Sequence, residues 1–445
     1  MNTFWTGFRE GDHIRSHIAK FRCMLFSTVF LCAASGCERS EPLGELQAIT
    51  HPKTVITALI WAPDWSDQMQ QIAEAFTREN PNIHVNVQFM IGESVEENIR
   101  PRIAAGNMPD LLSVNPNTFT AELADRGKLV DVSLTTAWAT MLDDLKPDWT
   151  SAGKKHFGVA GGVAATLLYY NMNLFKQAGI GNVPSNFDEF LKTCDRLKKA
   201  GITPIIWYGG FPNMLGNGPF SSGFANNIVA NEPRWKDKLI DGTLNLDVPE
   251  AADIFEKIKL IADRGYVQKG FMTTNYDEGI KLFTSGKVAM AFHGTWASGL
   301  LMQGKNFETG VFIPPWNAPR KKPVPVIGSE TGFAVGATTH RKEALLFLEY
   351  IMGKGYPILQ NKRQNIPPMR HPQGTMIGNP LITKYILRVS EFSVTASPYY
   401  SFLPATTIGL THSLMQDVLF NKRSPREAAV SLNQSIKNEA RSSHK

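Results

Sequence analysis

The chain has 445 residues, which is too long for one ordinary hydrophobic core and predicts two or more lobes. Hydrophobic residues make up 43% and charged residues 19%, the composition of a globular protein and not of a disordered one. The net charge of +6 is weak for this length, and no basic run is longer than Arg320-Lys321-Lys322, so the sequence argues against a nucleic-acid partner.

An export signal is expected at the amino terminus. Lys20 and Arg22 precede an apolar run over residues 24–31, and small residues follow up to Cys37. This order is typical of a signal peptide, here residues 1–36, and the apolar run is too short to span a bilayer, which needs about 20 residues. Residues 34–37 (ASGC) resemble a bacterial lipobox, with alanine where the motif usually has leucine, which predicts lipidation of Cys37. The alternative is an ordinary secretory signal that is cut nearby.

The cysteine content argues against disulfides and metal sites in the folded part. Of the four cysteines, Cys23 and Cys32 lie in the predicted signal, and Cys37 would carry lipid. The remaining thiol, Cys194, can form neither an internal disulfide nor a zinc site alone, and its helical surroundings predict a buried apolar side chain. We therefore expect no metal and no cofactor. The polar residues 37–52 are expected to be a tether.

The folded part opens with a β–α–β pattern. Residues 55–61 predict a buried strand, apolar residues at spacings of three and four over 69–76 predict a helix, and residues 83–89 alternate as a second strand. Such a unit predicts a parallel sheet. The elements expected next are a helix over 94–105, a strand over 111–114 and a helix over 120–126.

Alternating strands and helices continue through the rest of the chain. Asn186 is expected to cap a helix. Gly216 and Gly218 lack the third glycine of a dinucleotide-binding loop and are expected to form a turn. The pattern predicts α/β lobes, in which ligands bind beyond the carboxyl ends of the strands. The expected elements are strands over 164–170, 205–208, 288–292 and 332–336, and helices over 173–178, 187–200, 249–264, 277–284, 342–352 and most of 405–442.

Several short motifs, in order over residues 55–440, carry a resemblance to a known family. They are IAAGNMPD at 103–110, LADRGKL at 123–129, LYYN at 168–171, FDEF at 187–190, GKVAMAFHGTW at 286–296, and the segment 332–352. Together they resemble the extracellular solute-binding proteins of bacterial ABC importers, in the sugar-binding, maltose-binding-protein-like group (family 1).

The resemblance implies a type II periplasmic-binding-protein-like fold, in which two α/β lobes joined by hinge crossings close on a sugar. It also implies a monomer without catalytic activity, in the periplasm or on the outer cell surface, that delivers its ligand to an ABC permease in the membrane. The implied boundaries are 53–161 and 314–355 for the first lobe, and 162–313 and 356–445, with the carboxyl-terminal helices, for the second.

Trp296 is the first candidate for a ligand contact. In similar proteins this segment places its aromatic ring on the cleft wall, and Gly294 would leave the backbone open to close approach. A pyranose has an apolar face, which suits a flat ring, and a rim of hydroxyls, which needs donors and acceptors. The alternative for Trp296 is a place in the core. The other candidates are Asp64, Trp65, Asn115, Trp207, Phe211, Asn213, Trp316, Glu330 and Tyr399, with Tyr400 as an equal alternative to Tyr399.

A structural role is the alternative for several of these candidates. Asp64 also suits a helix N-cap, and Asn115 a turn. Trp207 is flanked by Ile205 and Ile206 and is equally suited to the core.

Two other function classes stay open. A glycoside hydrolase needs two carboxylates about 5 or 6.5–9.5 Å apart, for which Asp64 and Glu330 are candidates. Against an enzyme, the chain has no GxSxG, HExxH, GxxxxGK[ST] or CxxC motif. The second class is a sugar-sensing receptor subunit. The sequence does not identify the sugar, and a polyol, an amino sugar or a glycerol phosphate stays open; a phosphate would need an Arg or Lys in the cleft, which the sequence does not place.

Overall fold

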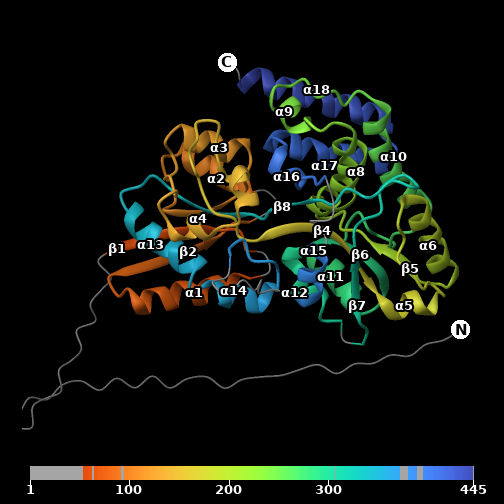
Figure 1. Cartoon of the computed structure of the whole chain (residues 1–445), viewed down its shortest axis with the longest axis horizontal. Helices are drawn as coiled ribbons and strands as arrows, with labels where there is room; N and C mark the ends of the chain where they lie inside the picture. Colours follow the sequence, from red (N-terminus) through yellow and green to blue (C-terminus); the bar gives the residue numbers. More distant parts are fainter. Residues whose placement is uncertain are drawn as a thin grey trace, which may run out of the picture. The chain divides into compact units, whose positions relative to one another are not determined.

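The computed structural model of this protein describes residues 54–62, 65–91, 95–304, 306–370, 379–387 and 394–443. The predicted signal peptide, the tether, the lipidation site Cys37 and the candidate Asp64 lie outside the described residues. The described strands fall into two sheets (Figure 1). None of the helices in these ranges is long and apolar enough to cross a membrane.

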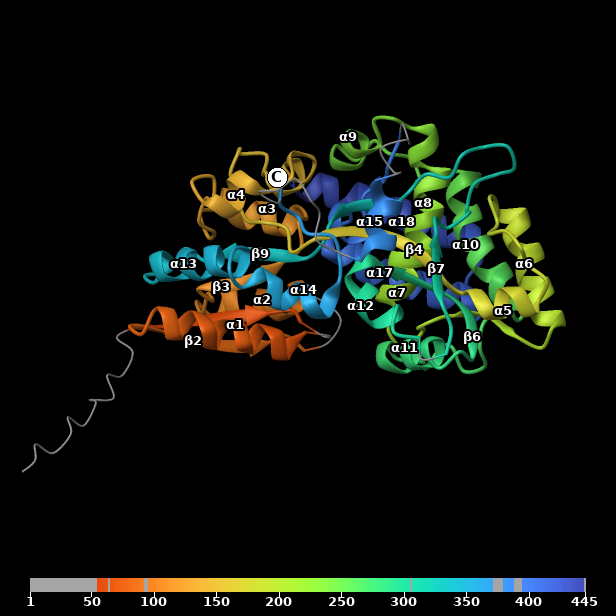
Figure 2. The same cartoon turned by 60° about the horizontal axis from the view of Figure 1, so that its bottom comes forward.

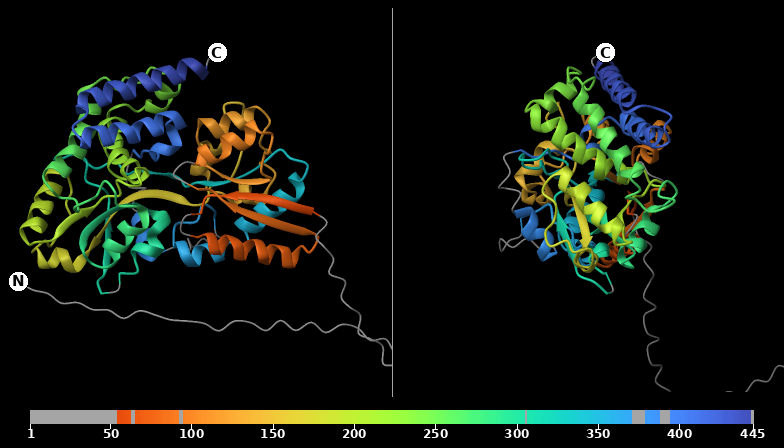
Figure 3. Two further views of the ribbon diagram at one scale, coloured as in Figure 1. Left: turned by 180° about the vertical axis from the view of Figure 1, so that it is seen from behind. Right: turned by 90° about the vertical axis from the view of Figure 1, so that its right-hand side faces the viewer.

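The first sheet has the strand order β2-β1-β3-β9. β1 pairs in parallel with β2 and β3, as the β–α–β pattern predicted, whereas β9 runs antiparallel to β3. In Figure 3, β1 and β2 lie side by side along their length. The strands are β1 (Thr54–Ile60), β2 (Ile83–Phe89), β3 (Leu111–Val114) and β9 (Gly332–Val335).

Helices pack around this sheet through buried apolar faces. Met69, Ile72 and Phe76 of α1 are buried, because apolar residues spaced by three and four lie on one face of a helix. α1 packs on α13 and α14, and α13 also packs on β9. The helices of this part are α1 (Ser66–Glu79), α2 (Val95–Ala104), α3 (Thr118–Asp125), α4 (Thr136–Thr140), the 3-10 helix η1 (Asp143–Trp149), α13 (Arg341–Met352) and α14 (Tyr356–Arg363).

The second sheet has the strand order β5-β6-β4-β7, and β8 pairs with the start of β4. β5 and β6 are parallel, whereas β4 runs antiparallel to β6, β7 and β8. Cys194 on α6 is fully buried, as predicted. The strands are β4 (Val163–Asn171), β5 (Thr203–Ile206), β6 (Val288–Gly294), β7 (Thr309–Phe312) and β8 (Ile327–Ser329).

The helices at the carboxyl end pack on this second part of the molecule. α17 and α18 contact each other and α10, and Figure 2 shows these three helices close together. The helices are α5 (Met172–Gln177), α6 (Phe187–Lys199), α7 (Asn213–Leu215), α8 (Ser221–Asn227), α9 (Trp235–Ile240), α10 (Pro249–Asp263), α11 (Tyr276–Thr284), α12 (Ser298–Leu301), α15 (Pro380–Leu387), α16 (Tyr399–Phe402), α17 (Ala405–Leu419) and α18 (Pro425–Ser443).

The turn predicted at Gly216 and Gly218 is wrong, because these residues belong to the π-helix η2 (Gly216–Phe220), which joins α7 to α8. Both glycines allow close packing. A Cβ on Gly216 would lie 2.4 Å from the Tyr399 ring, and one on Gly218 would lie 2.8 Å from the Cβ of Phe292. The glycines therefore reflect helix packing and not a turn.

Residues 158–162 and 329–332 connect the two sheets, and residues 363–366 lie against them; we call these three stretches the crossing segments. The backbone N–H of Glu330 donates to the Gly162 carbonyl at 3.0 Å, and that of Val163 donates to the Ile366 carbonyl at 2.9 Å. The sequence predicted that the chain returns to the first lobe at residue 314. In the structure, β8 still pairs with β4 of the second sheet, so the return lies later in the chain. The chain returns to the first sheet only at β9.

Replacing Asn186 by alanine is expected to lower the free energy of unfolding by about 1 kcal/mol. The Asn186 side chain accepts a hydrogen bond from the Glu189 backbone N–H at 3.0 Å and caps α6, as predicted. Alanine would leave this N–H without its partner. Urea unfolding measures the change, with replacement of the exposed Asn182 by alanine as the control. An equal loss in both variants would contradict the capping role.

Candidate ligand-binding site

A cavity of about 350 Å³ lies between residues of the first and the second sheet regions. Residues at its wall follow the carboxyl ends of β1, β3 and β6, where the open-sheet rule predicts ligands. Its lining combines aromatic rings with amide, carboxylate and guanidinium groups. The lining residues are Trp61, Trp65, Val95, Glu96, Glu97, Asn115, Phe211, Asn213, Met214, Asn217, Tyr276, Trp296, Glu330, Thr331, Arg363, Tyr400, Ile408, Gly409 and His412.

Trp296 lies just beyond the buried strand β6 and is half-buried in the cavity wall. A Cβ on Gly294 would lie 1.9 Å from Cζ3 of Trp296. The indole therefore folds back over the bare backbone of Gly294, and any larger residue there would displace the ring. Gly294 and Trp296 thus pack against each other and present an aromatic surface to the cavity.

His293 supports this aromatic wall from behind. It is 1% exposed, and its ring centroid lies 5.6 Å from that of Trp296 and 5.3 Å from that of Tyr276. Burial lowers the pKa of His293 to about 3, although a backbone hydrogen bond with Gly294 acts in the opposite direction. The imidazole is therefore neutral at physiological pH and serves as a packing surface.

Lowering the pH from 6.5 to 4.5 is expected to remove about 2.3 kcal/mol of stability through His293 alone. The unfolded chain takes up a proton below pH 6.5, whereas the folded His293 stays neutral down to about pH 3, so acid favours unfolding. Urea unfolding at both pH values measures the loss. His293→Leu should reduce this pH dependence, and the same change at the exposed His84 should not. An unchanged dependence in His293→Leu would contradict the assignment.

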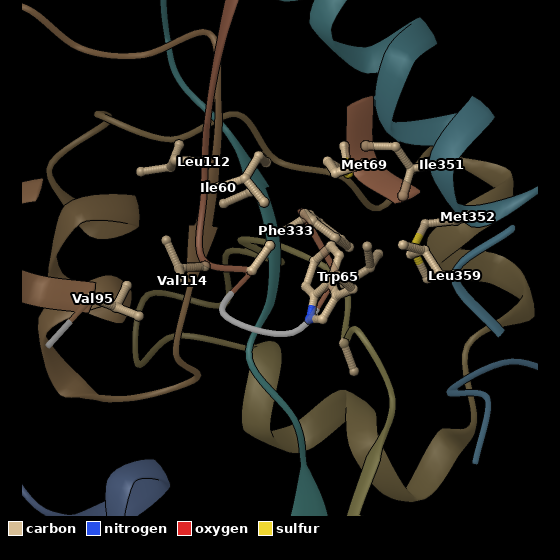
Figure 4. Packing of buried hydrophobic residues seen from close by; sticks show 14 of the residues in the cluster. Ile60, Trp65, Met69, Val95, Leu112, Val114, Phe333, Ile351, Met352 and Leu359 are labelled. Atoms are coloured by element: carbon tan, nitrogen blue, oxygen red, sulfur yellow. The ribbon is translucent and has the colours of Figure 1, made fainter. Parts of the chain in front are cut away.

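The first sheet contributes Trp65, which is 9% exposed at the start of α1. Its ring packs edge-on against Phe333, with centroids 6.3 Å apart, among apolar residues shown in Figure 4. The Arg363 guanidinium lies 5.0 Å from the centroid of the Trp65 ring. Trp65 is thus fixed from two sides, and together with Trp61 it brings aromatic surface to the cavity from this lobe.

Asn115 lines the cavity and is already held by its neighbours. Its Oδ1 accepts from the Thr331 hydroxyl at 2.6 Å, and its Nδ2 donates to Glu96 Oε1 at 3.1 Å. The Asn117 amide donates to the same Glu96 oxygen at 2.6 Å. An amide group has two hydrogens and two lone pairs. Asn115 therefore keeps capacity for a ligand while its orientation is fixed.

Glu330 and Arg363 form a buried ion pair at the cavity. Glu330 is 2% exposed and Arg363 6% exposed. Glu330 Oε2 accepts from Arg363 Nη2 and, at 2.8 Å, from the Asn365 amide. Burial raises the pKa of Glu330, and the charge of Arg363 opposes this effect. Because the pair joins two crossing segments, it ties the cavity wall to the connections between the sheets.

A second polar group joins the carboxyl-terminal helix α17 to the cavity. The Tyr399 hydroxyl donates to Asn213 Oδ1 and lies 2.7 Å from His412 Nε2. Burial lowers the pKa of His412 to about 4, so this imidazole is neutral at physiological pH. Asn213 and His412 line the cavity, and Tyr399 orients both from behind.

Three candidates from the sequence do not line the cavity, and their expected role is corrected. Trp207 is 1% exposed and packs on Phe271, with ring centroids 5.7 Å apart. Trp316 is fully buried and packs on Phe292 at 5.2 Å. Both indoles fill the core of the second lobe. Tyr399 is also fully buried, and the adjacent Tyr400 lines the cavity in its place.

The candidates that the structure brings together at the cavity are Trp65, Asn115, Phe211, Asn213, Trp296 and Glu330. Sequence reasoning missed Trp61, Tyr276, Arg363 and His412. Trp61 is the last residue of the first predicted strand, so its position at a carboxyl strand end was a usable signal. Arg363 and His412 lie in helices far along the chain, and no motif marks them. Among the described residues, no group of three or more His, Cys, Asp or Glu side chains is placed to hold a metal ion.

Comparison with known proteins gives consistent matches. A family profile described as bacterial extracellular solute-binding protein matches residues 62–356. The multiple sugar-binding protein of Streptococcus mutans is 26% identical over 297 residues, which cover 64% of this chain and 67% of that protein. The melibiose/raffinose/stachyose-binding protein of Bacillus subtilis is 24% identical over 350 residues, covering 75% of this chain and 77% of that protein.

Solved structures match over most of the chain. A chitin oligosaccharide binding protein has a TM-score of 0.75 at 20% identity and covers 87% of this chain and 98% of its own. The solute-binding protein RafE in complex with raffinose has a TM-score of 0.71 at 21% identity and covers 87% of this chain and 99% of its own. At this identity the likeness concerns the fold, and the two-lobed α/β fold predicted from the sequence is confirmed.

Proposed function

Because this chain belongs to the bacterial extracellular solute-binding protein family, we propose that it binds a sugar or oligosaccharide in the cavity between its lobes and delivers it to an ABC-importer permease. Its fold is the type II periplasmic-binding-protein fold. Relatives whose names state a ligand, such as the proteins of Streptococcus mutans and Bacillus subtilis, are named for sugars. These names support a sugar as the ligand class.

The observation that carries the proposal is the composition of the cavity wall. Aromatic rings come from both sheet regions and alternate with amides and hydroxyls; the rings are Trp61, Trp65, Phe211, Tyr276, Trp296 and Tyr400. A pyranose needs flat apolar surface for its ring faces and paired donors and acceptors for its hydroxyls. We propose Trp65, Asn115, Phe211, Asn213 and Trp296 as direct contacts.

The crossing segments suit a hinged closure around the ligand. The cavity lining includes Glu330, Thr331 and Arg363 from these segments, next to rings from both lobes. A ligand that contacts both lobes binds the closed form better than the open one and shifts the population toward closure. A micromolar dissociation constant corresponds to about −8 kcal/mol, which is what remains after the cost of closure.

A binding role fits the carboxylates of the cavity better than hydrolysis does. A glycosidase needs one protonated and one ionised carboxyl group on either side of the scissile bond. Of the three described carboxylates that line the cavity, Glu330 is held by Arg363 and Asn365 and Glu96 accepts bonds from two amides, so these two have a structural task, whereas no such task is assigned to Glu97. We therefore propose that the bound sugar leaves unchanged.

A ligand screen by thermal shift tests the proposal. The probes are raffinose, melibiose, stachyose and chitin oligosaccharides, with sodium gluconate as an open-chain control. A ligand at 100 times its dissociation constant stabilises the folded state by about 2.7 kcal/mol, which raises the melting temperature measurably. Calorimetry then gives the affinity, and chromatography of the incubated sugar tests for turnover. No shift with any sugar, or consumption of the sugar, would overturn the proposed function.

Export and anchoring are part of the same proposal. We propose that the chain is exported, that Cys37 is lipidated, and that the protein acts as a monomer at the membrane surface. The family is one of extracellular proteins, which supports export. Membrane fractionation of the wild type and of Cys37→Ser tests the anchor. The variant is expected in the soluble fraction, and equal membrane association of both would contradict lipidation at Cys37.

A further inference from the structure

Arg363 is the only arginine or lysine that lines the cavity in the described part of the chain. An anionic sugar, with a carboxylate or phosphate, needs such a cation in a closed site, because burying an unpaired charge is costly. The wall also carries the carboxylates Glu96, Glu97 and Glu330, so Arg363 is the one cationic group that could attract an acidic ligand among the described lining residues.

Both terminal nitrogens of the Arg363 guanidinium are occupied, whereas its Nε is buried without a partner in the described residues. Nη2 donates to Glu330 Oε2, Nη1 donates to the Gly161 carbonyl at 3.3 Å, and its plane lies 5.0 Å from the centre of the Trp65 ring. Both charged side chains are more than nine-tenths buried, so salt screens the pair little. The cation is thus neutralised inside the protein before any ligand arrives.

We propose that Glu330 is a specificity-determining residue, which masks the charge of Arg363 and makes the cavity reject acidic sugars in favour of uncharged ones. This inference rests on the proposed sugar-binding function. It replaces the expectation that Glu330 is simply one of several hydroxyl-binding groups. The inference depends on the pairing of Arg363 with Glu330, because an unpaired Arg363 in the same cavity would favour a ligand carboxylate.

The second oxygen of Glu330 adds to this selection. Glu330 Oε1 is fully buried. The nearby Thr295 hydroxyl donates to the Val163 carbonyl at 2.7 Å. An ionised carboxylate accepts hydrogen bonds only, so it offers no donor to a ligand carboxylate and repels it. Neutralisation of Arg363 by Glu330 and repulsion of a ligand carboxylate by Glu330 both disfavour an acidic sugar.

Glu330 cannot easily turn away to release Arg363. Its backbone N–H donates to the Gly162 carbonyl at 3.0 Å, and the Asn365 amide holds its carboxylate at 2.8 Å. A Cβ on Gly162 would lie 2.4 Å from Glu330 Oε2, which shows how closely the backbone encloses this carboxylate. The mask is therefore a fixed part of the binding site.

The first test compares two ligands on the wild type. The neutral probe is the sugar with the largest thermal shift in the screen, and the acidic probe is the same sugar with one primary hydroxymethyl group oxidised to a carboxylate. Calorimetry at about 0.05 and 0.5 M NaCl is expected to show the neutral sugar bound at least about tenfold more tightly at both. An acidic sugar that binds within about threefold of the neutral one would overturn the inference.

The second test removes the mask. In Glu330→Gln, the dissociation constant of the acidic sugar divided by that of the neutral sugar is expected to fall at least about tenfold relative to the wild type. The matched control is Asp110→Asn, a buried carboxylate outside the cavity whose Oδ2 accepts from the Thr57 N–H at 2.9 Å. The control should keep the wild-type ratio. An unchanged ratio in Glu330→Gln, or an equal change in the control, would overturn the inference.

A double variant covers the case in which Glu330→Gln does not fold. Glu330→Gln combined with Arg363→Met removes both charges, and buried ion pairs often tolerate such joint replacement. It is expected to keep rejecting the acidic sugar, because no cation is left to attract it; acceptance of the acidic sugar would contradict the mask. Lack of binding of every neutral sugar by the wild type would instead overturn the proposed function and this inference together.

Discussion

Replacing Trp296 by alanine is expected to weaken binding of the neutral sugar at least about tenfold, or about 1.4 kcal/mol. The indole is half-buried, lies over Gly294 and faces the cavity, so its removal takes away the surface on which a sugar ring would stack. The fold should lose little, because the neighbouring His293 and strand β6 stay fully packed. Calorimetry measures the affinity, and thermal unfolding of the unliganded protein measures the stability.

Trp138 offers a matched control for this substitution. It is 9% exposed, stacks on His156 with ring centroids 4.3 Å apart, and does not line the cavity. Trp138→Ala is expected to reduce stability and leave the affinity unchanged. Equal affinities of Trp296→Ala and the wild type would remove Trp296 from the binding site.

Replacing Gly162 by alanine is expected to destabilise the protein by about 3 kcal/mol. The added Cβ would lie 2.3 Å from the Asn365 amide nitrogen and 2.4 Å from Glu330 Oε2. Both neighbours are buried, and Glu330 is held by Arg363, so relief of the clash must break the buried polar network. Urea unfolding measures the loss.

The control for this second prediction is Gly181→Ala. A Cβ there would meet nothing within 4 Å, so we expect a change in stability of less than about 0.5 kcal/mol. If Gly162→Ala were as stable as the control, the crossing segments would have room to move apart. The rigid placement of Glu330 would then be contradicted.

Sequence patterns predicted the regular elements well where local signals are strong. Helix α6 has a capping asparagine, Asn186, and a buried face with the predicted Cys194. Helix α11 ends at Thr284, as the helix predicted over 277–284 does, and Gly286 takes a positive φ before β6. These features depend on a few neighbouring residues, and so they can be predicted without knowledge of the fold.

The short strands β7 and β8 were not predicted, and both depend on pairing with β4. β8 has three residues, too few for an alternating pattern to be recognised. The same omission moved the predicted return to the first lobe from β9 to residue 314. A short strand that is stabilised mainly by its partner strand has only a weak pattern in its own sequence.

Among the site candidates that follow strands, some line the cavity and Trp207 does not. Trp65 and Trp296 were expected near the ligand from the family resemblance, and Asn115 from its position at the carboxyl end of a predicted strand. Trp207 follows β5, yet its indole turns into the core and packs on Phe271. The direction of a side chain after a strand depends on the neighbouring elements, so the sequence pattern alone does not predict this direction.

The sequence by itself determined the class of fold and the family, because these follow from periodicity, turn residues and ordered motifs. Only the tertiary structure decided which rings reach the cavity and which fill the core. It alone paired Glu330 with Arg363, which are 33 residues apart along the chain. The physical reason is that burial and pairing of charges depend on contacts between distant segments, and these form only when the crossing segments meet.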